Sequence, residues 1–95
     1  MKGGLNGRLT DRQLLDRLSA GDKRVVLAFA RANMNLSKAA RLAYMSRQGM
    51  RYRLDKVRVE TGFDPTDFHD LTRLVSAIEQ ERRDYDRQSY DASGG

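Results

Sequence analysis

Two short stretches of helical periodicity, separated by a polar break, occupy residues 35–62. Small and apolar residues recur at helical spacing in the first stretch: Leu36, Ala39, Ala40 and Ala43. Adjacent alanines let a second helix approach closely, as crossing helices require. Ser46 follows the break and is a good N-cap for the next helix. Two short helices joined by a tight turn are the pattern of a helix-turn-helix.

The second stretch has two different sides when it is wound at about 100° per residue. One side holds Met50, Leu54, Val57 and Thr61. The opposite side holds Gln48, Arg51, Tyr52 and Asp55. Gly62 can adopt the left-handed conformation that ends helices, so the second helix is expected to stop there. We expect this helix to bury its first side and expose the second.

The charge of the chain is unevenly distributed. The whole sequence carries a formal charge of +5, but residues 23–58 hold ten Lys or Arg and one acid. Residues 64–91 hold four Arg and eight acids. A basic segment that includes the second helix indicates a surface for a polyanion, with an acidic region held apart from it. The alternative is a solvated surface of uneven charge that needs no partner.

In a helix-turn-helix, the N-terminal end of the second helix points into the major groove of DNA. Arg47 can hydrogen-bond guanine through O6 and N7, and Gln48 can bond adenine through N6 and N7. Arg51 can reach a base or a phosphate, and Tyr52 a phosphate or a sugar. The complete set of predicted DNA-binding residues is Ser46, Arg47, Gln48, Arg51, Tyr52, Asn35, Ser37 and Lys56.

These residues also have alternative roles. Asn35 and Ser37 open the first helix of the pair, where they can bond a phosphate or serve only as caps. Lys56 can contact the DNA backbone or belong to the solvated surface. Gly49 costs about 1 kcal/mol relative to alanine inside a helix. It either allows a closer approach to DNA or is simply tolerated.

The patterns N-L-S-x-A-A-R-L, Ser46-Arg47, R-Y-R-L and T-G-F-D closely resemble the C-terminal DNA-binding domain of PucR/CdaR-type bacterial transcription regulators. A looser resemblance is to the DNA-binding end of Fis-type proteins. The resemblance to PucR/CdaR-type regulators covers roughly residues 24–78 and implies a Fis-like helix-turn-helix that regulates transcription. Gln48-Gly49 stands where the family usually has Asn-Thr, so the base preference need not carry over. Glu60 also replaces a usually apolar residue, so packing at that helix end can differ.

Two helices are expected before this unit. Thr10, with Gln13 three residues on, is a capping-box pattern, and Gly21 ends the helix that it starts. Asp22 caps the next helix, which runs to about Asn33. The apolar residues expected from these two helices are Leu14, Leu15, Leu18, Val25, Val26, Phe29 and Ala30. The first helix either completes the core, which is our expectation, or pairs two copies of the protein.

One helix is expected after the unit. Phe63 is predicted to fold back onto the core, and Asp64-Pro65 is a helix-start signal. The apolar stripe of this helix is Phe68, Leu71, Leu74, Val75 and Ile78. This helix can cover the domain, or its stripe can meet a second copy. The stripe is more apolar surface than one small core easily uses, so we predict a homodimer, which also suits two DNA half-sites. The single histidine, His69, lies off the stripe and is expected at the surface.

Ninety-five residues are enough for one small domain. We predict an all-α fold, a small Fis-like bundle of about five helices in residues 10–80, with the helix-turn-helix at 35–62. Residues 1–9 contain three glycines and are expected to form a flexible arm. Beyond Ile78 the last helix can extend for a turn or two. Residues 81–95 are expected to form a charged, disordered tail, and the last ten of them have no apolar stripe.

The composition also argues against several classes of protein. There is no cysteine, one histidine and no glycine-rich phosphate loop, so we expect neither an enzyme nor a metal or cofactor site. No apolar run approaches the length of a membrane span, and the N-terminus lacks the apolar core of a signal peptide. A cytoplasmic protein without a membrane partner is expected. The regulators that the chain resembles carry ligand-sensing domains ahead of this module, and we expect no such domain within these 95 residues.

The expected function is therefore sequence-specific binding of double-stranded DNA by a small transcriptional regulator. One alternative is an adaptor that keeps the helical fold and docks on another regulator or on polymerase. An adaptor would not need Arg47, Gln48 and Arg51 on one side of a helix. The other alternative is non-specific architectural DNA binding, which would be recognised by indifference to DNA sequence.

Overall fold

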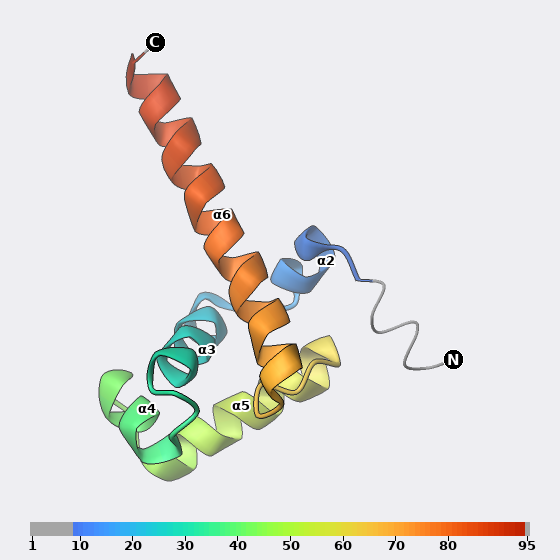
Figure 1. Ribbon diagram of the computed structural model, residues 1–95, viewed down its shortest axis with the longest axis vertical. Coiled ribbons are helices and arrows are strands. Elements are labelled where there is room, and N and C mark those ends of the chain that lie inside the picture. The colour runs from blue at the N-terminus through green and yellow to red at the C-terminus, as the bar shows by residue number, and fades with distance from the viewer. Residues whose placement is uncertain (1–8, 95) are drawn as a thin grey trace.

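The computed structural model describes residues 9–94, and over that range it consists of five α-helices (Figure 1). They are α2 (Asp11–Asp16), α3 (Ala20–Arg31), α4 (Leu36–Leu42), α5 (Arg47–Thr61) and α6 (Phe68–Gly94). No strand occurs among these residues, so the predicted all-α class and helical bundle are confirmed. None of the described helices is both long enough and apolar enough to cross a membrane. The predicted arm lies outside the described residues, apart from Leu9.

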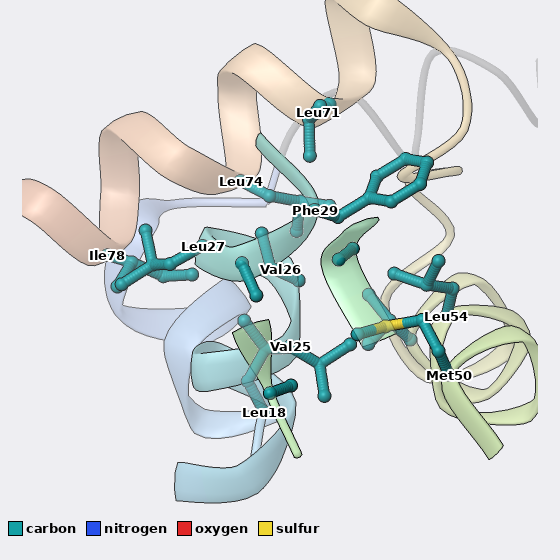
Figure 2. Close-up of a cluster of buried hydrophobic side chains, with 14 of the residues drawn as sticks. Leu18, Val25, Val26, Leu27, Phe29, Met50, Leu54, Leu71, Leu74 and Ile78 are labelled. Atoms are coloured by element: carbon teal, nitrogen blue, oxygen red, sulfur yellow. The ribbon is translucent and has the colours of Figure 1, made fainter. Parts of the chain in front are cut away.

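The helices are arranged around α3 (Figure 1). Both α4 and α5 pack against α3 and against each other, while α6 packs on α3 and α2 packs on α6. The core lies where these helices meet (Figure 2). Its members labelled there are Leu18, Val25, Val26, Leu27, Phe29, Met50, Leu54, Leu71, Leu74 and Ile78. Helix α3 therefore connects the helix-turn-helix to the rest of the domain.

Helix α2 begins at the predicted capping box. The hydroxyl of Thr10 accepts a hydrogen bond from the backbone N–H of Gln13, and the Gln13 carboxamide accepts one from Thr10 N–H. The helix ends at Asp16, earlier than the predicted end at Gly21. The Leu14 side chain is fully buried, so this short helix contributes to the core.

Helix α3 begins earlier than predicted, because a second capping box precedes it. The Ser19 hydroxyl accepts a hydrogen bond from Asp22 N–H, and the Asp22 carboxylate accepts one from Ser19 N–H. The prediction that Asp22 is the cap is therefore wrong, and Gly21 lies in the first turn of α3 instead of ending α2. The helix ends at Arg31, close to the predicted Asn33.

Helix α6 begins later than predicted. The Asp64 carboxylate accepts hydrogen bonds from both the N–H and the hydroxyl of Thr66, which closes a turn around the buried Pro65. This local bonding competes with helix, as short polar side chains often do. The helix starts instead at Phe68, and the Asp67 carboxylate caps it by accepting from the amide three residues on.

Helix α6 also ends later than predicted. Its backbone continues to Gly94, where the sequence predicts a disordered tail over residues 81–95. Glu81 pairs with Lys23 of α3, with Nζ 3.0 Å from Oε1, and Gln80 donates a hydrogen bond one turn further along α6. These contacts support the continuation of the helix as far as Asp84. Figure 1 shows α6 extending well past the other helices.

The apolar stripe of α6 is used largely within the chain. Leu71, Leu74 and Ile78 are buried in the core, and Val75 is half-buried. Only Phe68, at 65% exposure, remains mostly in solvent. Helix α6 therefore has little apolar surface left over to support a homodimer. The homodimer stays a prediction.

Candidate nucleic-acid interface

Helices α4 and α5 form the helix-turn-helix, and both begin at the predicted caps. Asn35 Oδ1 accepts a hydrogen bond from Lys38 N–H at 2.9 Å. Ser46 Oγ accepts one from Gly49 N–H, also at 2.9 Å. Gly62 ends α5 with a φ of 81°, in the left-handed region, as predicted. The start and the end of α5 are therefore both fixed by local bonding.

Helix α5 has the two sides expected from its periodicity. The side chains of one side are buried: Met50, Leu54, Val57 and Thr61. Thr61 is polar but fully bonded, because its hydroxyl donates to the Val57 carbonyl at 2.7 Å and accepts from Phe63 N–H at 3.0 Å. Phe63 is buried, as predicted. The side chains of the other side are exposed: Gln48, Arg51, Tyr52 and Asp55.

Five of the eight predicted DNA-binding residues lie at the N-terminal half of α5 or at its cap: Ser46, Arg47, Gln48, Arg51 and Tyr52. All five are exposed, and Tyr52 is 70% exposed. Gln48, Arg51 and Tyr52 line one concave surface of about 790 Å³, which Leu36 of α4 also lines. The structure therefore brings three of the predicted residues together beside the start of α4.

Asn35 and Ser37 flank Leu36 at the start of α4, and both are exposed. The carboxamide oxygen of Asn35 is occupied by the cap, so its NH₂ group is the part left for an outside partner. The Ser37 hydroxyl makes no side-chain hydrogen bond in the part of the chain that the structure describes.

Lys56 has a different environment from the other predicted residues. Its Nζ lies 3.5 Å from Oδ2 of Asp22, and Nη1 of Arg53 lies 3.3 Å from Oδ1 of the same carboxylate. The Asp22 side chain is 1% exposed, whereas that of Lys56 is 39% exposed. Lys56 therefore faces α3 as well as solvent, and part of its charge is compensated within the protein.

The pKa of the Asp22 carboxyl lies below its ordinary value. Burial alone would raise this pKa by disfavouring the charged form, but hydrogen bonding from Ser19 and the positive charge of Lys56 outweigh burial. The carboxylate is therefore ionised at neutral pH. Sequence reasoning gave Asp22 only a capping role, because Arg53 is 31 residues away and no local pattern connects the two.

The charges at the C-terminal half of the exposed side compensate one another. Asp55 Oδ1 lies 2.7 Å from Nη2 of Arg58. This hydrogen bond and the Asp55 charge raise the pKa of Arg58, and the nearby Asp64 carboxylate adds to the effect. Arg47 and Arg51, by contrast, have no ion pair among the described residues. The uncompensated positive charge of α5 therefore lies in its N-terminal half.

Comparison with known proteins gave one kind of match. No curated protein and no solved structure matched the chain. The family model of the PucR C-terminal helix-turn-helix domain matched residues 23–79, which contain nearly all of α3, all of α4 and α5, and the first part of α6. The match covers more than half of the sequence and includes the caps and both sides of α5 described above. The chain therefore belongs to the family of PucR C-terminal helix-turn-helix domains.

Proposed function

We propose that this protein is a sequence-specific regulator of transcription that places the N-terminal half of α5 in the major groove of double-stranded DNA. The PucR helix-turn-helix family is one of DNA-binding regulators and is not enzymatic. The observation that supports sequence-specific binding by α5 is the placement of Arg47, Gln48 and Arg51. They are exposed on the N-terminal half of α5, and the two arginines have no ion pair among the described residues.

Two of these residues suit direct readout of base edges. Arg47 suits guanine, where a guanidinium can bond O6 and N7 together, and Gln48 suits adenine through N6 and N7. Arg51 lies one turn later, where it reaches a base or a phosphate. A good two-bond contact to a base contributes about 1–3 kcal/mol of discrimination against the wrong base. We therefore assign specificity to these three side chains.

The other proposed residues suit contacts to the DNA backbone. Such contacts fix the position of a protein on the duplex without reading its sequence. Ser46 and Tyr52 are beside the base-reading residues, and Asn35 and Ser37 are at the start of the neighbouring helix. Lys56 contributes less to DNA affinity than an unpaired lysine would, because the Asp22 carboxylate already compensates part of its charge.

The proposal includes a homodimer acting in the cytoplasm. Helix-turn-helix dimers bind two half-sites about one helical turn of DNA apart, and each protomer supplies one recognition helix. Sedimentation equilibrium of the free protein and of its complex with duplex would measure the assembly directly. A 1:1 complex on the preferred site would contradict the dimer but leave the contacts of α5 untouched.

The experiment is selection of a preferred duplex from a random pool, followed by fluorescence anisotropy with the selected site and with a mixed-sequence duplex across a salt series. A specific binder prefers the selected site, and its affinity falls with salt on a log–log slope that reports phosphate contacts. Arg51→Ala should weaken specific binding by about 1–3 kcal/mol and relax the base preference. Lys56→Ala should weaken binding to both duplexes equally.

Arg12→Ala is the matched control, because it removes an exposed positive charge from α2 instead of α5. Its effect on affinity should be much smaller than that of Arg51→Ala. Equal affinity of the wild-type protein for every duplex would favour architectural binding. No binding at low salt, by a sample that is folded, would favour the adaptor and overturn the proposal.

A further inference from the structure

Tyr44 combines extreme exposure with an unusual backbone. It lies in the turn between α4 and α5, two residues before the Ser46 cap. Its side chain is 96% exposed, more than any other large hydrophobic residue in the described range. Its φ is 57°, in the left-handed region that favours glycine. Because the tyrosine side chain lies in solvent, contacts within the described chain do little to offset the energetic cost of this backbone conformation.

The ending of α4 explains why the backbone needs this conformation. Tyr44 N–H donates to the Arg41 carbonyl at 3.2 Å, and Met45 N–H donates to the Ala40 carbonyl at 2.9 Å. These two bonds form a Schellman motif, in which the residue after the C-cap is left-handed and is usually glycine. The turn therefore requires the positive φ but does not require a tyrosine.

The other non-glycine residues with positive φ differ from Tyr44 in this respect. They are Asn33, with φ of 55°, and Met34, with φ of 65°. Asparagine tolerates the left-handed region because of its short polar side chain. Met34 is half-buried and packs against the core. Tyr44 has neither property, so nothing within the described chain accounts for a tyrosine at this position.

We propose that Tyr44 is a DNA-contacting residue that extends the interface of α5 onto the turn before it. This inference rests on the proposed function. Two exposed arginines, Arg41 and Arg47, stand three residues to either side of Tyr44, and Arg47 belongs to the proposed interface, so this turn directly precedes the base-reading end of α5. The phenol ring packs against a deoxyribose at the edge of the groove, and its hydroxyl donates a hydrogen bond to a phosphate oxygen.

Replacing Tyr44 by glycine distinguishes a role of the tyrosine in folding stability from a role in DNA binding. Tyr44→Gly removes the side chain and leaves the residue that a Schellman motif favours, so the melting temperature should stay the same or rise. Its affinity for duplex DNA should fall by about tenfold, as expected for one lost hydrogen bond and its packing. Tyr85→Ala is the control, because Tyr85 is another exposed tyrosine, at 69%, on α6. It should leave DNA affinity unchanged.

Anisotropy with duplex DNA and thermal unfolding followed by circular dichroism provide the two readings. Loss of affinity at an unchanged or raised melting temperature supports the contact, and Tyr44→Phe then shows whether the hydroxyl or the ring makes it. A Tyr44→Gly protein that binds like the wild type overturns this inference alone. A lowered melting temperature also overturns it, because the tyrosine then serves the fold. Wild-type protein that binds no duplex overturns both this inference and the proposed function.

Discussion

The buried carboxylate of Asp22 on α3 lies 3.3 Å from the guanidinium of Arg53 on α5. Its other oxygen lies 3.5 Å from the ammonium of Lys56, so one carboxylate holds two cations of the second helix of the helix-turn-helix. Gly21 leaves room for this arrangement, because a Cβ at that position would lie 2.8 Å from Nη1 of Arg53. The orientation of α5 on α3 is therefore supported by an ionic contact as well as by the core.

Asp22→Asn should lower the free energy of unfolding at pH 7 by about 1–3 kcal/mol. The amide keeps the size of the side chain but removes the charge that faces Arg53 and Lys56. Urea denaturation measures the loss. Asp16→Asn, at an exposed position of α2, is the control and should change stability by less than about 0.5 kcal/mol. Equal stability of the two variants would mean that the ionic contact contributes nothing net.

The contribution of Asp22 should disappear in acid. Its pKa in the folded protein is below the ordinary value of 3.8, so the folded state binds the proton less readily than the unfolded state does. The stability it contributes is therefore complete above about pH 3.8 and is lost as the pH falls through the folded pKa. The stability difference between wild type and Asp22→Asn should shrink in that acid range. Asp64, whose pKa is also lowered, is present in both proteins and cancels in this comparison.

Ser46→Ala should destabilise the protein by about 1 kcal/mol, because it removes the side-chain cap of α5. Ser37→Ala is a matched control inside α4, where the serine caps nothing and alanine is the better helix former. Its stability should stay the same or rise. Thermal unfolding of the two variants under one set of conditions checks the difference. Equal melting temperatures would show that the Ser46 cap is energetically unimportant.

Substitutions on the buried side of α5 should lower stability, and substitutions on its exposed side should weaken DNA binding. Met50 is fully buried, so Met50→Ala should cost about 2–5 kcal/mol of stability. Tyr52, at 70% exposure, lies on the other side, and Tyr52→Ala should change stability by less than about 0.5 kcal/mol while weakening DNA binding. Urea denaturation and anisotropy measure the two quantities. A large loss of stability in Tyr52→Ala would contradict the assignment of that side to DNA.

Removal of residues 84–95 should leave the domain folded. Among the residues of α6 whose burial the structure describes, up to residue 87, the last buried one is Ile78, and the Lys23–Glu81 ion pair is retained in the shortened chain. The melting temperature of the remaining core should therefore be close to that of the full chain, and DNA affinity should be unchanged. Circular dichroism and anisotropy test both expectations. A marked fall in melting temperature would show that the removed part of α6 makes stabilising contacts.

Most of the local structure around the helix-turn-helix could be predicted, because it depends on residues close together in the sequence. The caps at Asn35 and Ser46, the stop at Gly62 and the two sides of α5 all follow from neighbours within one or two turns. The errors occurred where two local patterns compete. Ser19 starts a helix across the glycine that was expected to end one, and the Asp64 side chain closes a turn ahead of α6.

Features that depend on tertiary packing could not be predicted in the same way. The exposed side of α5 follows from helical periodicity, which is why the exposure of Gln48 and Arg51 could be predicted. The partnership of Lys56 with Asp22 spans 34 residues and depends on how α3 crosses α5. The use of the α6 stripe is a similar case, because only the position of α3 shows that Leu71 and Leu74 have partners within the chain.

Because α6 is long, a small rotation of the domain displaces the far end of this helix by a larger distance. The helix has 27 residues and is about 40 Å long at 1.5 Å per residue, and the last of its residues that the structure describes as buried is Ile78. Because a helix is stiff, a tilt of about 5° at the packed end moves a point some 25 Å along the axis by about 2 Å. Small rotations of the body are therefore amplified at the far end of α6. A pair of spectroscopic labels, one on that end and one on α4, would report such rotations as a change in distance.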